Sequence, residues 1–395
     1  MPDCYATIIG GGIIGTAVAY EMSSIVDRET ICLIERNPTF PGENQTSRNS
    51  GVLHAGIYYD QAQTPLKATL CVEGNRRMYQ FCREHNLPAQ QTGKLVVATT
   101  YEEDKSLDDL LLRSRENDVP GVEKIDGTHA RELEPNIKAY SALWVPTSGI
   151  VDPTSVVRKL RELSTGEYFL LGTEVTSIIP RKGEFIVKVS TIGAGDNEFS
   201  TKYLINAAGL SSDEVARMVN PEFPLKIFPV RGEAAKFYQS RRDLQISRNI
   251  YPVPLSYPKP DGSEHRTLGV HLTPTFSVGM KGDFAQDHGN FLLGTEVTVG
   301  PLNRKRGDNI TKDDFGSDLA PPSQFREKIE PFFPGIRLED LQLHQTGIQA
   351  VLANSQDFHI APDVIHPRMI NAVGICSPGL TASLAIATMV RHFLE

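Results

Sequence analysis

The chain has little cysteine and no motif that would use it. Five cysteines occur among 395 residues, an odd number, and no two of them form a CxxC pair. No cysteine and histidine have the spacing of a zinc site either. We therefore expect neither a disulfide framework nor a bound metal, and the free thiols suit a reducing compartment.

An excess of positive charge is also missing. The 40 Lys and Arg residues stand against 48 Asp and Glu residues, for a formal net charge of -8. Nucleic acids and anionic lipids attract proteins through Lys and Arg, so this balance argues against nucleic acid as a partner and against broad binding to a charged membrane. A small anionic substrate would need a local basic pocket.

No hydrophobic run has the character of an export signal or a membrane span. The N-terminal MPDCYATIIGGG has no basic segment before its apolar stretch, so we expect no signal peptide. Residues 369–390 carry no Asp, Glu, Lys or Arg, but Asn, Gly, Ser and Pro interrupt them. That stretch favours a strand, a loop and a buried helix. We expect a cytoplasmic protein, with peripheral membrane contact left open.

The residues that are present suit a globular protein with a sizeable core. Hydrophobic residues make up 40% of the chain and charged residues 22%, and the length allows one elaborate domain or two to three intertwined ones. Apolar runs predict strands at 5–9 and 30–35 with a helix at 13–24 between them. Further helices are expected at 66–82 and 101–117.

Later in the chain the pattern changes. Strands are predicted at 94–98, 185–190 and 203–206, with Ser211 and Ser212 as helix N-caps after the last of them. Residues 243–322 are rich in Pro, Gly and turn residues. They favour antiparallel strands and long loops over a second parallel sheet.

The strongest motif is a GxGxxG sequence between the first strand and the first helix. Glu35 follows twenty residues after Gly15, at the end of the second strand, as in a dinucleotide-binding fingerprint. A side chain at Gly10 or Gly12 would keep the backbone away from a pyrophosphate, while the positive end of the helix faces it. Glu35 would accept hydrogen bonds from the ribose. The residues expected at the dinucleotide are Gly10, Gly12, Ile13, Ile14, Gly15, Glu35 and Arg36.

The fingerprint by itself does not distinguish NAD from FAD, because both present the same pyrophosphate and ribose. Six further segments do distinguish them. Together with the fingerprint they closely resemble the L-2-hydroxyglutarate dehydrogenase/oxidase family of D-amino-acid-oxidase-like FAD enzymes. The segments are GENQTSRNSGVLHAGIYY (42–59), LWVPTSGIVDP (143–153), YLINAAGLSSDEVA (203–216), FPVRGE (228–233), GVHLT (269–273) and GICSPGLTASLAIA (374–387).

The resemblance implies an α/β fold in two parts. A glutathione-reductase-like Rossmann domain would bind FAD through residues 1–90, 146–220 and 340–395. An inserted, mainly antiparallel, β-rich substrate domain would comprise residues 91–145 and 221–339. FAD would lie extended and buried between scattered segments of the chain.

The resemblance also implies further FAD contacts. A loop of small polar residues would wrap the pyrophosphate and the flavin edge, and Val175 occupies the place where relatives pair backbone with adenine. Free N–H groups where Pro378 and Gly379 open a helix would stabilise the reduced flavin. A solvated loop, small-residue packing and a helix capped by Ser377 are the structural alternatives. The added candidates are Thr46, Ser47, Arg48, Asn49, Ser50, Gly51, Val175, Ala208, Gly209, Gly347, Gly374, Gly379, Leu380 and Thr381.

Oxidation of a 2-hydroxy acid to the 2-oxo acid, by hydride transfer to flavin N5, needs a base for the hydroxyl proton. Histidine suits neutral pH, and His54 and His271 lie in the motif segments, without a decision on which is the base. Arg48 and Arg231 are the candidate cations for the substrate's carboxylates. Either arginine could instead hold FAD phosphate or an acid at a domain interface.

Several alternatives stay open at this point. Many relatives carry arginine where this chain has Gln349, so a different hydroxy or amino acid is admissible as substrate. An amine or amino-acid oxidase of the same superfamily and a flavin-binding scaffold subunit are the rival functions. The electron acceptor, oxygen or a quinone, and the oligomeric state are also undecided.

Overall fold

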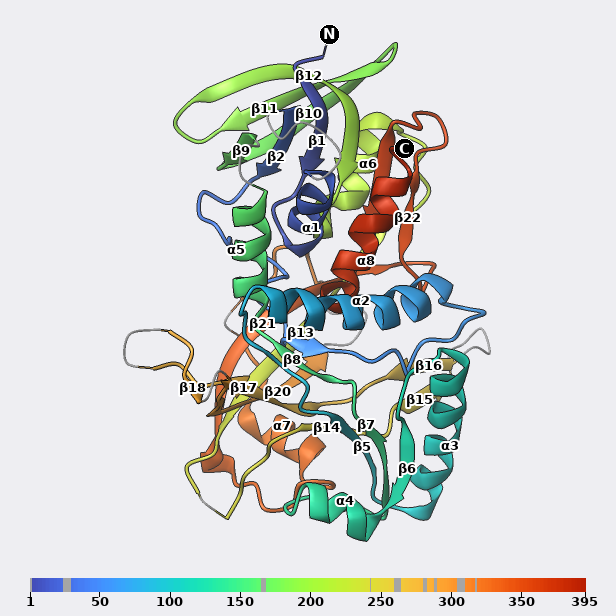
Figure 1. Ribbon diagram of the computed structural model, residues 1–395, viewed down its shortest axis with the longest axis vertical. Coiled ribbons are helices and arrows are strands. Elements are labelled where there is room, and N and C mark those ends of the chain that lie inside the picture. The colour runs from blue at the N-terminus through green and yellow to red at the C-terminus, as the bar shows by residue number, and fades with distance from the viewer. Residues whose placement is uncertain are drawn as a thin grey trace.

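Two large sheets lie one above the other, with α2 (Pro65–Glu84) crossing between them (Figure 1). This computed structural model describes residues 2–23, 30–164, 168–241, 243–258, 264–279, 283–287, 290–303, 310–316 and 318–395. Both sheets have eight strands. Both chain termini lie at the end of the molecule that contains the upper sheet (Figure 1).

The upper sheet has the order β10-β11-β12-β1-β2-β9, with β23 and β22 beyond β12. Its parallel centre forms because β1 and β2 are short apolar runs that are almost fully buried. The strands are β1 (Cys4–Ile9), β2 (Ile31–Glu35), β9 (Tyr168–Leu171), β10 (Thr173–Arg181), β11 (Glu184–Thr191), β12 (Gly195–Asn206), β22 (His359–Pro362) and β23 (Met369–Val373).

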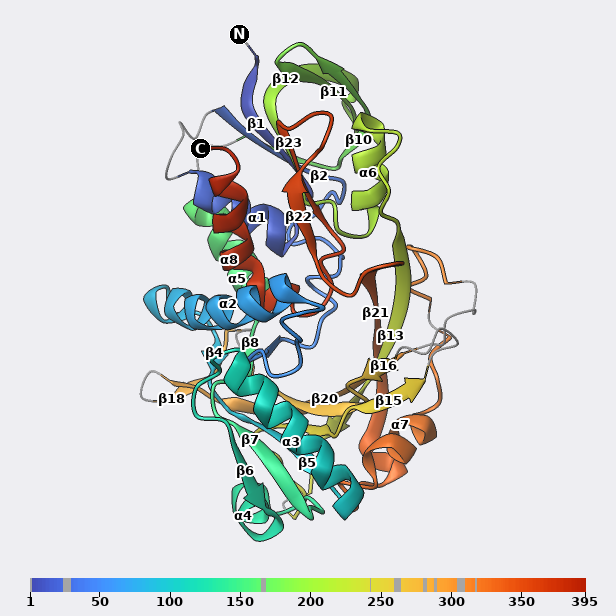
Figure 2. The same cartoon turned by 90° about the vertical axis from the view of Figure 1, so that its right-hand side faces the viewer.

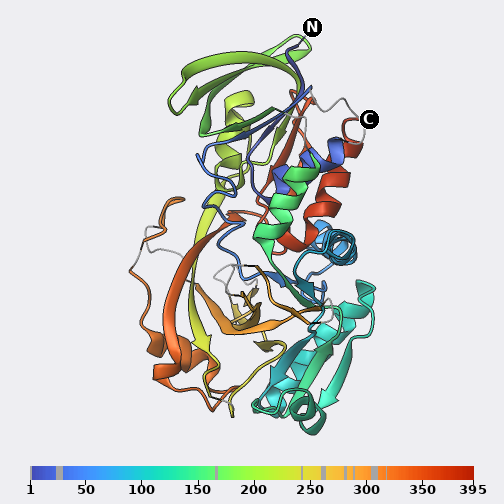
Figure 3. The ribbon, with the colours of Figure 1, turned by 60° about the vertical axis from the view of Figure 1, so that its left-hand side comes forward.

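Helices cover both faces of the upper sheet. In Figures 2 and 3, α1 (Ile13–Met22), α5 (Pro153–Leu163) and α8 (Gly379–His392) lie together on one face, and Figure 2 places α6 (Ser212–Val219) on the other. Nearly every residue of α1 is buried, since neighbouring helices pack around it. This doubly covered parallel sheet is the expected dinucleotide-binding layer.

The lower sheet has the order β21-β13-β20-β17-β14-β5-β7-β6. It is antiparallel except for the β14 and β5 pair, which is parallel. The strands are β5 (Lys94–Ala98), β6 (Glu123–Asp126), β7 (Ser141–Val145), β13 (Ile227–Tyr238), β14 (Asn249–Pro252), β17 (His271–Phe276), β20 (Leu293–Asn303) and β21 (Leu341–Leu352).

Helices and small sheets complete the lower layer. The helices α3 (Tyr101–Glu116), α4 (Gly127–Leu133) and α7 (Pro322–Ile329) pack around the lower sheet, with Phe237, Phe325 and Phe333 in its core. The small sheets pair β3 (Val52–Leu53) and β4 (Ala89–Gln90) with β8 (Gly149–Val151), β15 (Leu255–Pro258) with β16 (Glu264–Thr267), and β18 (Gln286–Asp287) with β19 (Asn290–Phe291).

One long strand pair connects the two layers. β13 and β21 remain hydrogen-bonded from the Ile227 and Leu352 pair to the Phe237 and Leu341 pair. The first pair packs in the core of the upper layer and the second in the core of the lower layer. By its hydrogen bonds β21 belongs to the lower sheet, and the domain boundary expected at residue 340 stays a prediction.

Most predicted elements are confirmed, with small shifts at their ends. The predicted helix at 13–24 ends at Met22, and residue 24 lies outside the described part of the chain. Of the two predicted N-caps, Ser211 occupies the N-cap position of α6, whereas Ser212 is the first residue of the helix. A 3-10 turn, η2 (Gly209–Ser211), runs directly into α6, the Ser211 hydroxyl makes no cap bond, and the Ser212 hydroxyl donates to the Gly209 carbonyl at 2.7 Å.

The stretch 243–322 also differs in one respect from the prediction. Its described residues form antiparallel pairs, apart from β14 along β5, and α7 begins at its end.

Among the described residues, no helix combines the length and the apolar character that a membrane crossing needs.

Candidate functional site

A cavity of about 250 Å³ lies at the carboxyl ends of β1 and β2. It occupies the crevice where an open parallel sheet of this kind binds its ligand. Much of the predicted cofactor set lines it, namely Gly10, Gly12, Ile13, Ile14, Glu35, Arg36, Thr46, Val175, Ala208 and Gly209. The sequence interpretation missed other lining residues, among them Asn37, Asn44, Gln45, Thr173, Glu174, Glu214 and Phe315.

The Glu35 carboxylate is fixed at the wall of this cavity. One of its oxygens accepts from the Gly11 amide at 2.8 Å, and the other accepts from the Asn37 amide and side chain, each at 2.8 Å. A carboxylate has about four acceptor positions, so about one remains for a ribose hydroxyl. Glu35 is only 6% exposed, which keeps that position within the cavity.

The glycines of the fingerprint bring three segments of backbone together. Gly10 has a φ of 109°, and a Cβ there would lie 2.4 Å from the Ala207 carbonyl oxygen. A Cβ at Gly15 would lie 1.8 Å from the Gly10 carbonyl oxygen. The hydroxyl of Thr46 accepts from the Ile13 amide at 3.0 Å at the start of α1. Helix, turn and neighbouring strand are therefore close enough for backbone contact with a pyrophosphate.

Residues 47–51 lie outside the lining of this cavity, and apart from Arg48, which also donates to the Thr346 carbonyl of β21, their side chains contact their own loop. Ser47 donates to the Asn44 carbonyl at 3.1 Å, and the Asn49 side chain accepts from the Gly51 amide at 2.7 Å. Arg48 pairs with Glu43 at 2.5 Å, while its guanidinium lies 4.8 Å from the centre of the Phe315 ring. Ser50 is half-buried in the same loop.

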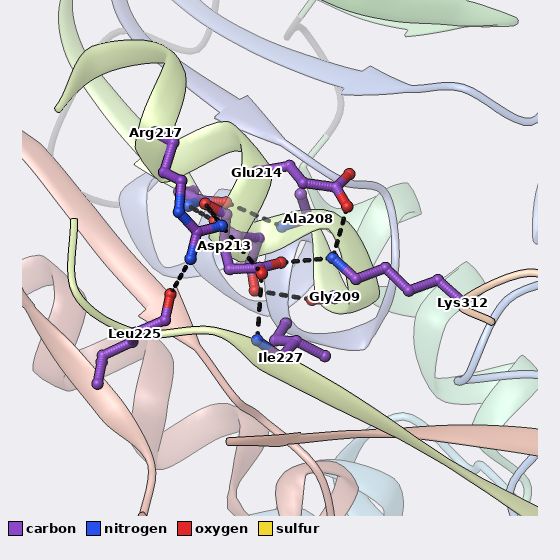
Figure 4. Close-up of polar contacts among 10 residues, drawn as sticks. Ala208, Gly209, Asp213, Glu214, Arg217, Leu225, Ile227 and Lys312 are labelled. Atoms are coloured by element: carbon purple, nitrogen blue, oxygen red, sulfur yellow. Dashed lines mark hydrogen bonds and ion pairs between the residues drawn. The ribbon is translucent and has the colours of Figure 1, made fainter. Parts of the chain in front are cut away.

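The outer wall of the cavity joins α6 to residues 310–316 (Figure 4). The Lys312 ammonium lies 2.5 Å from an Asp213 oxygen and 2.7 Å from a Glu214 oxygen. The other Asp213 oxygen accepts from the Ile227 amide and from Arg217, each at 3.1 Å. Burial would raise the pKa of Asp213, but these donors outweigh it and lower that pKa. The wall is thus held by charged contacts.

The start of α8 lies against His54, the residue that follows β3. The His54 amide donates to the Thr381 hydroxyl at 3.1 Å, and His54 Nε2 lies 3.3 Å from the Ser377 hydroxyl. Pro378 at the helix N-cap position makes no side-chain cap bond. Ser377 therefore contacts His54 and does not cap the helix. Gly379 and Leu380, the first two residues of α8, lie beside this contact.

Two glycines of the predicted set allow close packing here. A Cβ at Gly374 would lie 2.4 Å from Leu352 Cγ, and one at Gly347 would lie 2.8 Å from the Arg48 carbonyl oxygen. Gly347 thereby brings β21 against the loop that follows Thr46. The two ends of the chain meet at this point, as an extended dinucleotide site requires.

His54 and His271 are buried in the same region, at 8% and 4% exposure. Burial and, to a smaller extent, the nearby Lys94 together lower the pKa of His271 to about 3. Burial, Lys94 and His271 lower the pKa of His54 well below its usual range. Both rings are neutral at pH 7. His54 Nδ1 and His271 Nε2 have no hydrogen-bond partner among the described residues.

Lys94 completes this cluster, and the sequence interpretation missed it. The side chain is 1% exposed, and its ammonium lies 3.9 Å from the centre of the Tyr251 ring, which stacks on the His271 ring at 3.8 Å. The sequence does contain a signal for Lys94: it begins the strand KLVVA, in which the four remaining residues are all apolar. Such a lysine has no solvated face to occupy.

Arg231 is used by acidic groups of its own chain. It is 1% exposed, and its two Nη atoms contact Asp314 and Asp318, each at 2.8 Å. Its Nε lies 3.4 Å from a Glu233 oxygen. These contacts agree with the alternative in which Arg231 holds acidic groups between segments of the chain. The predicted role as a cation for a substrate carboxylate stays a prediction.

Known proteins resemble the chain over almost its full length. The L-2-hydroxyglutarate dehydrogenase of Indibacter alkaliphilus is 32% identical over 413 residues, covering 98% of this chain and 98% of that protein. The mitochondrial L-2-hydroxyglutarate dehydrogenase of Caenorhabditis elegans is 30% identical over 418 residues, covering 99% and 93%.

Solved structures share the fold at lower identity. The L-alpha-glycerophosphate oxidase of Mycoplasma pneumoniae, with FAD bound, has a TM-score of 0.78 at 22% identity, covering 98% of this chain and 94% of that one. The glycine oxidase of Geobacillus kaustophilus has a TM-score of 0.76 at 16% identity, covering 100% and 95%.

A family model described as DAO, FAD dependent oxidoreductase, matches residues 6–392. That range includes the fingerprint cavity, the histidine cluster and the start of α8. The cavity lined by the GxGxxG turn and Glu35 agrees with this match. The chain belongs to the DAO family of FAD dependent oxidoreductases.

Proposed function

We propose that this protein oxidises L-2-hydroxyglutarate, or a close 2-hydroxy acid, to the 2-oxo acid with FAD as cofactor. The observation that carries the proposal is the 32% identity, across 98% of the chain, to a protein named L-2-hydroxyglutarate dehydrogenase. Two buried, neutral histidines with free ring nitrogens supply the chemistry that a hydroxy acid needs.

FAD fits the residues that surround the cavity. Glu35 has an acceptor position for the adenosine ribose, and the Gly10 turn admits a pyrophosphate at the start of α1. The start of α8 would face the flavin with its N–H groups. When bound, FAD supplies the acceptor for the hydride that leaves the substrate carbon. The remaining predicted FAD contacts, and the division into an FAD domain and a substrate domain, stay predictions.

The protein's own residues would move the hydroxyl proton. His271 Nδ1 lies 3.2 Å from the Gly269 carbonyl oxygen, which only accepts, so Nδ1 carries the hydrogen. The lone pair of His271 is then on Nε2, the nitrogen without a partner. His54 is oriented by the Ser377 hydroxyl, which can donate or accept. This difference favours His271 as the base and His54 as its neighbour at the reacting carbon.

The experiment is anaerobic reduction of the purified yellow protein. We expect L-2-hydroxyglutarate to bleach the flavin absorbance, and the D enantiomer, the matched control, to leave it unchanged. Bleaching by glycine or sarcosine but not by L-2-hydroxyglutarate would contradict the substrate and favour an amine oxidase. A protein that no donor bleaches would favour the scaffold subunit.

The electron acceptor needs a separate measurement. Oxygen consumption during turnover would identify an oxidase, whereas turnover that depends on an added quinone would identify a dehydrogenase. A quinone acceptor would also require contact with a membrane surface. Co-sedimentation with lipid vesicles tests that contact, and its absence would favour a cytoplasmic enzyme that uses a soluble acceptor.

A further inference from the structure

Lys94 is a buried cation, and the residues that the structure describes supply no counter-ion for it. It begins β5, in the interior of the lower sheet, and only 1% of the residue is exposed. Its ammonium has no hydrogen-bond partner among the described residues, and none of their acidic side chains forms an ion pair with it. In the fold, β5 lies below α2, near the junction of the two layers (Figure 1).

The groups around Lys94 are neutral at pH 7. Tyr251 of β14 and Tyr58 present their rings to the ammonium at 3.9 Å and 5.2 Å. Burial raises the pKa of Cys71, on α2, and of both tyrosines, so none of them is an anion. His54 and His271, from β17, are also uncharged, since burial lowers the pKa of each.

Burying an unpaired ammonium opposes folding, and two aromatic rings compensate for only part of that loss. Four other buried polar atoms here also lack a hydrogen-bond partner among the residues that the structure describes: the Tyr58 and Tyr251 hydroxyls, His54 Nδ1 and His271 Nε2. One cation, two hydroxyl donors and two nitrogen acceptors are the complement of an anion that also carries a hydroxyl group.

We propose that the Lys94 ammonium binds a carboxylate of the substrate and so places the hydroxy acid between His54 and His271. This inference rests on the proposed function, because it assigns the place where that substrate's negative charge binds. The Tyr58 and Tyr251 hydroxyls donate to the same carboxylate. Arg231 is not available for this role, because Asp314 and Asp318 occupy its Nη atoms.

The pKa of Lys94 gives the site a pH dependence. Burial lowers that pKa to about 7 in the free protein. The ammonium is charged below this pH, so carboxylate affinity is highest there. Above it, a carboxylate must bind together with a proton, and the affinity falls about tenfold for each pH unit. The other titratable groups around Lys94 stay neutral through pH 6 to 9.

The experiment titrates FAD-loaded protein with glutarate, a dicarboxylate that has no hydroxyl group to oxidise, and follows the flavin absorbance. Wild-type protein is compared with Lys94→Met, Lys94→Arg and the surface control Lys159→Met, whose lysine pairs with Glu162. We expect Lys94→Met to lose at least about 10-fold in affinity, as for a charge-assisted hydrogen bond. Lys159→Met should bind like wild type.

The arginine variant keeps the test decisive if the methionine variant folds poorly. Arginine stays charged throughout, so Lys94→Arg should bind glutarate without the loss of affinity above pH 7. Ligand-free Lys94→Met should be at least as resistant to unfolding as wild type, because it lacks a buried charge. Glutarate should raise the unfolding temperature of wild type and leave that of Lys94→Met unchanged.

Two results would overturn the proposal. One is unchanged glutarate affinity in Lys94→Met, and the other is a loss of affinity near pH 7 that persists in Lys94→Arg. Failure of the proposed function looks different: wild type would bind glutarate through Lys94 yet not be bleached by L-2-hydroxyglutarate. Conversely, either of the two results above, with bleaching by L-2-hydroxyglutarate intact, would refute only the carboxylate site.

Discussion

At the scale of single residues, the environment decides what a histidine can do. His54 and His271 are neutral because burial and a nearby ammonium oppose their protonation. The surface residue His129 has no such environment. The residue type gave the prediction of a base, while burial sets the protonation state at which that base can work.

Replacing His271 should slow the chemistry without releasing FAD. We expect His271→Gln to reduce the rate of anaerobic flavin reduction by about 10²- to 10⁴-fold, the usual contribution of a general base. His129→Gln is the matched control. Rapid-mixing absorbance gives the rate, and the flavin-to-protein ratio shows that the cofactor is retained. A normal rate in His271→Gln would shift the role of base to His54.

Gly10 should tolerate no side chain, because of a steric clash and because of its positive φ. A control variant with a positive φ and no clash separates the two effects. In Gly10→Ala the new Cβ meets the Ala207 carbonyl oxygen and the residue keeps a positive φ. Gly193 has a positive φ too, but nothing lies within 4 Å of its added Cβ. We expect Gly193→Ala to cost about 1–2 kcal/mol in unfolding free energy. Gly10→Ala should cost more and lower FAD content, as urea unfolding and flavin absorbance would show; equal losses in both variants would contradict the clash.

At the scale of elements, residues 310–316 close one side of the nucleotide cavity. Lys312 reaches α6, Asp313 lies 3.9 Å from Arg36, and Asp314 contacts Arg231. Phe315 of the same segment lines the cavity. A short segment without regular structure is thus fixed by charges from several elements, as Figure 4 shows for Lys312.

Loss of the Lys312 contacts should speed FAD release. We expect Lys312→Met to raise the dissociation rate roughly 3- to 5-fold, equivalent to ~0.6–1 kcal/mol for partly exposed pairs. Lys328→Met is the control, since its pair with Glu327 is exposed and belongs to α7. Recovery of flavin fluorescence after dilution gives the rate. If both variants release FAD at the wild-type rate, the segment does not retain the cofactor.

At the scale of the whole molecule, the site depends on contacts between the two layers. The long β13 and β21 pair connects the sheets, and the Asn75 side chain of α2 donates to the His54 and Thr147 carbonyls, each at 3.0 Å. His271 and Lys94 lie on strands of the lower sheet, and His54 contacts Ser377 and Thr381 at the start of α8 in the upper layer. A cofactor bound between such segments should stabilise the molecule as a unit.

Removal of FAD should therefore lower the unfolding temperature of the protein. Restoring FAD to 100 times its dissociation constant should return about 2.7 kcal/mol of stability. Calorimetry on the cofactor-free protein, with increasing FAD, measures this shift, and NAD is the control ligand. A shift with NAD and none with FAD would contradict the cofactor.

The sequence by itself determined the family, the cofactor and most of the parallel layer. The GxGxxG turn, Glu35 and the apolar runs at 5–9 and 30–35 are local patterns, and local patterns fix turns, helices and buried strands. The likeness of six motif segments added FAD and the hydroxy-acid chemistry. Those predictions depend on residues that are close together in the chain or on similarity between amino-acid sequences.

Only the tertiary structure decided how the site is assembled. Ser377 contacts His54 across 323 positions of sequence, and Arg48 contacts the Thr346 carbonyl across 298. No local pattern specifies such pairs, because they form when both layers fold around β13 and β21. The tertiary structure also brings acidic side chains to Arg231 and pairs β21 with the lower sheet. It buries the Lys94 ammonium, which has no hydrogen-bond partner in the described part of the chain, beside two neutral histidines.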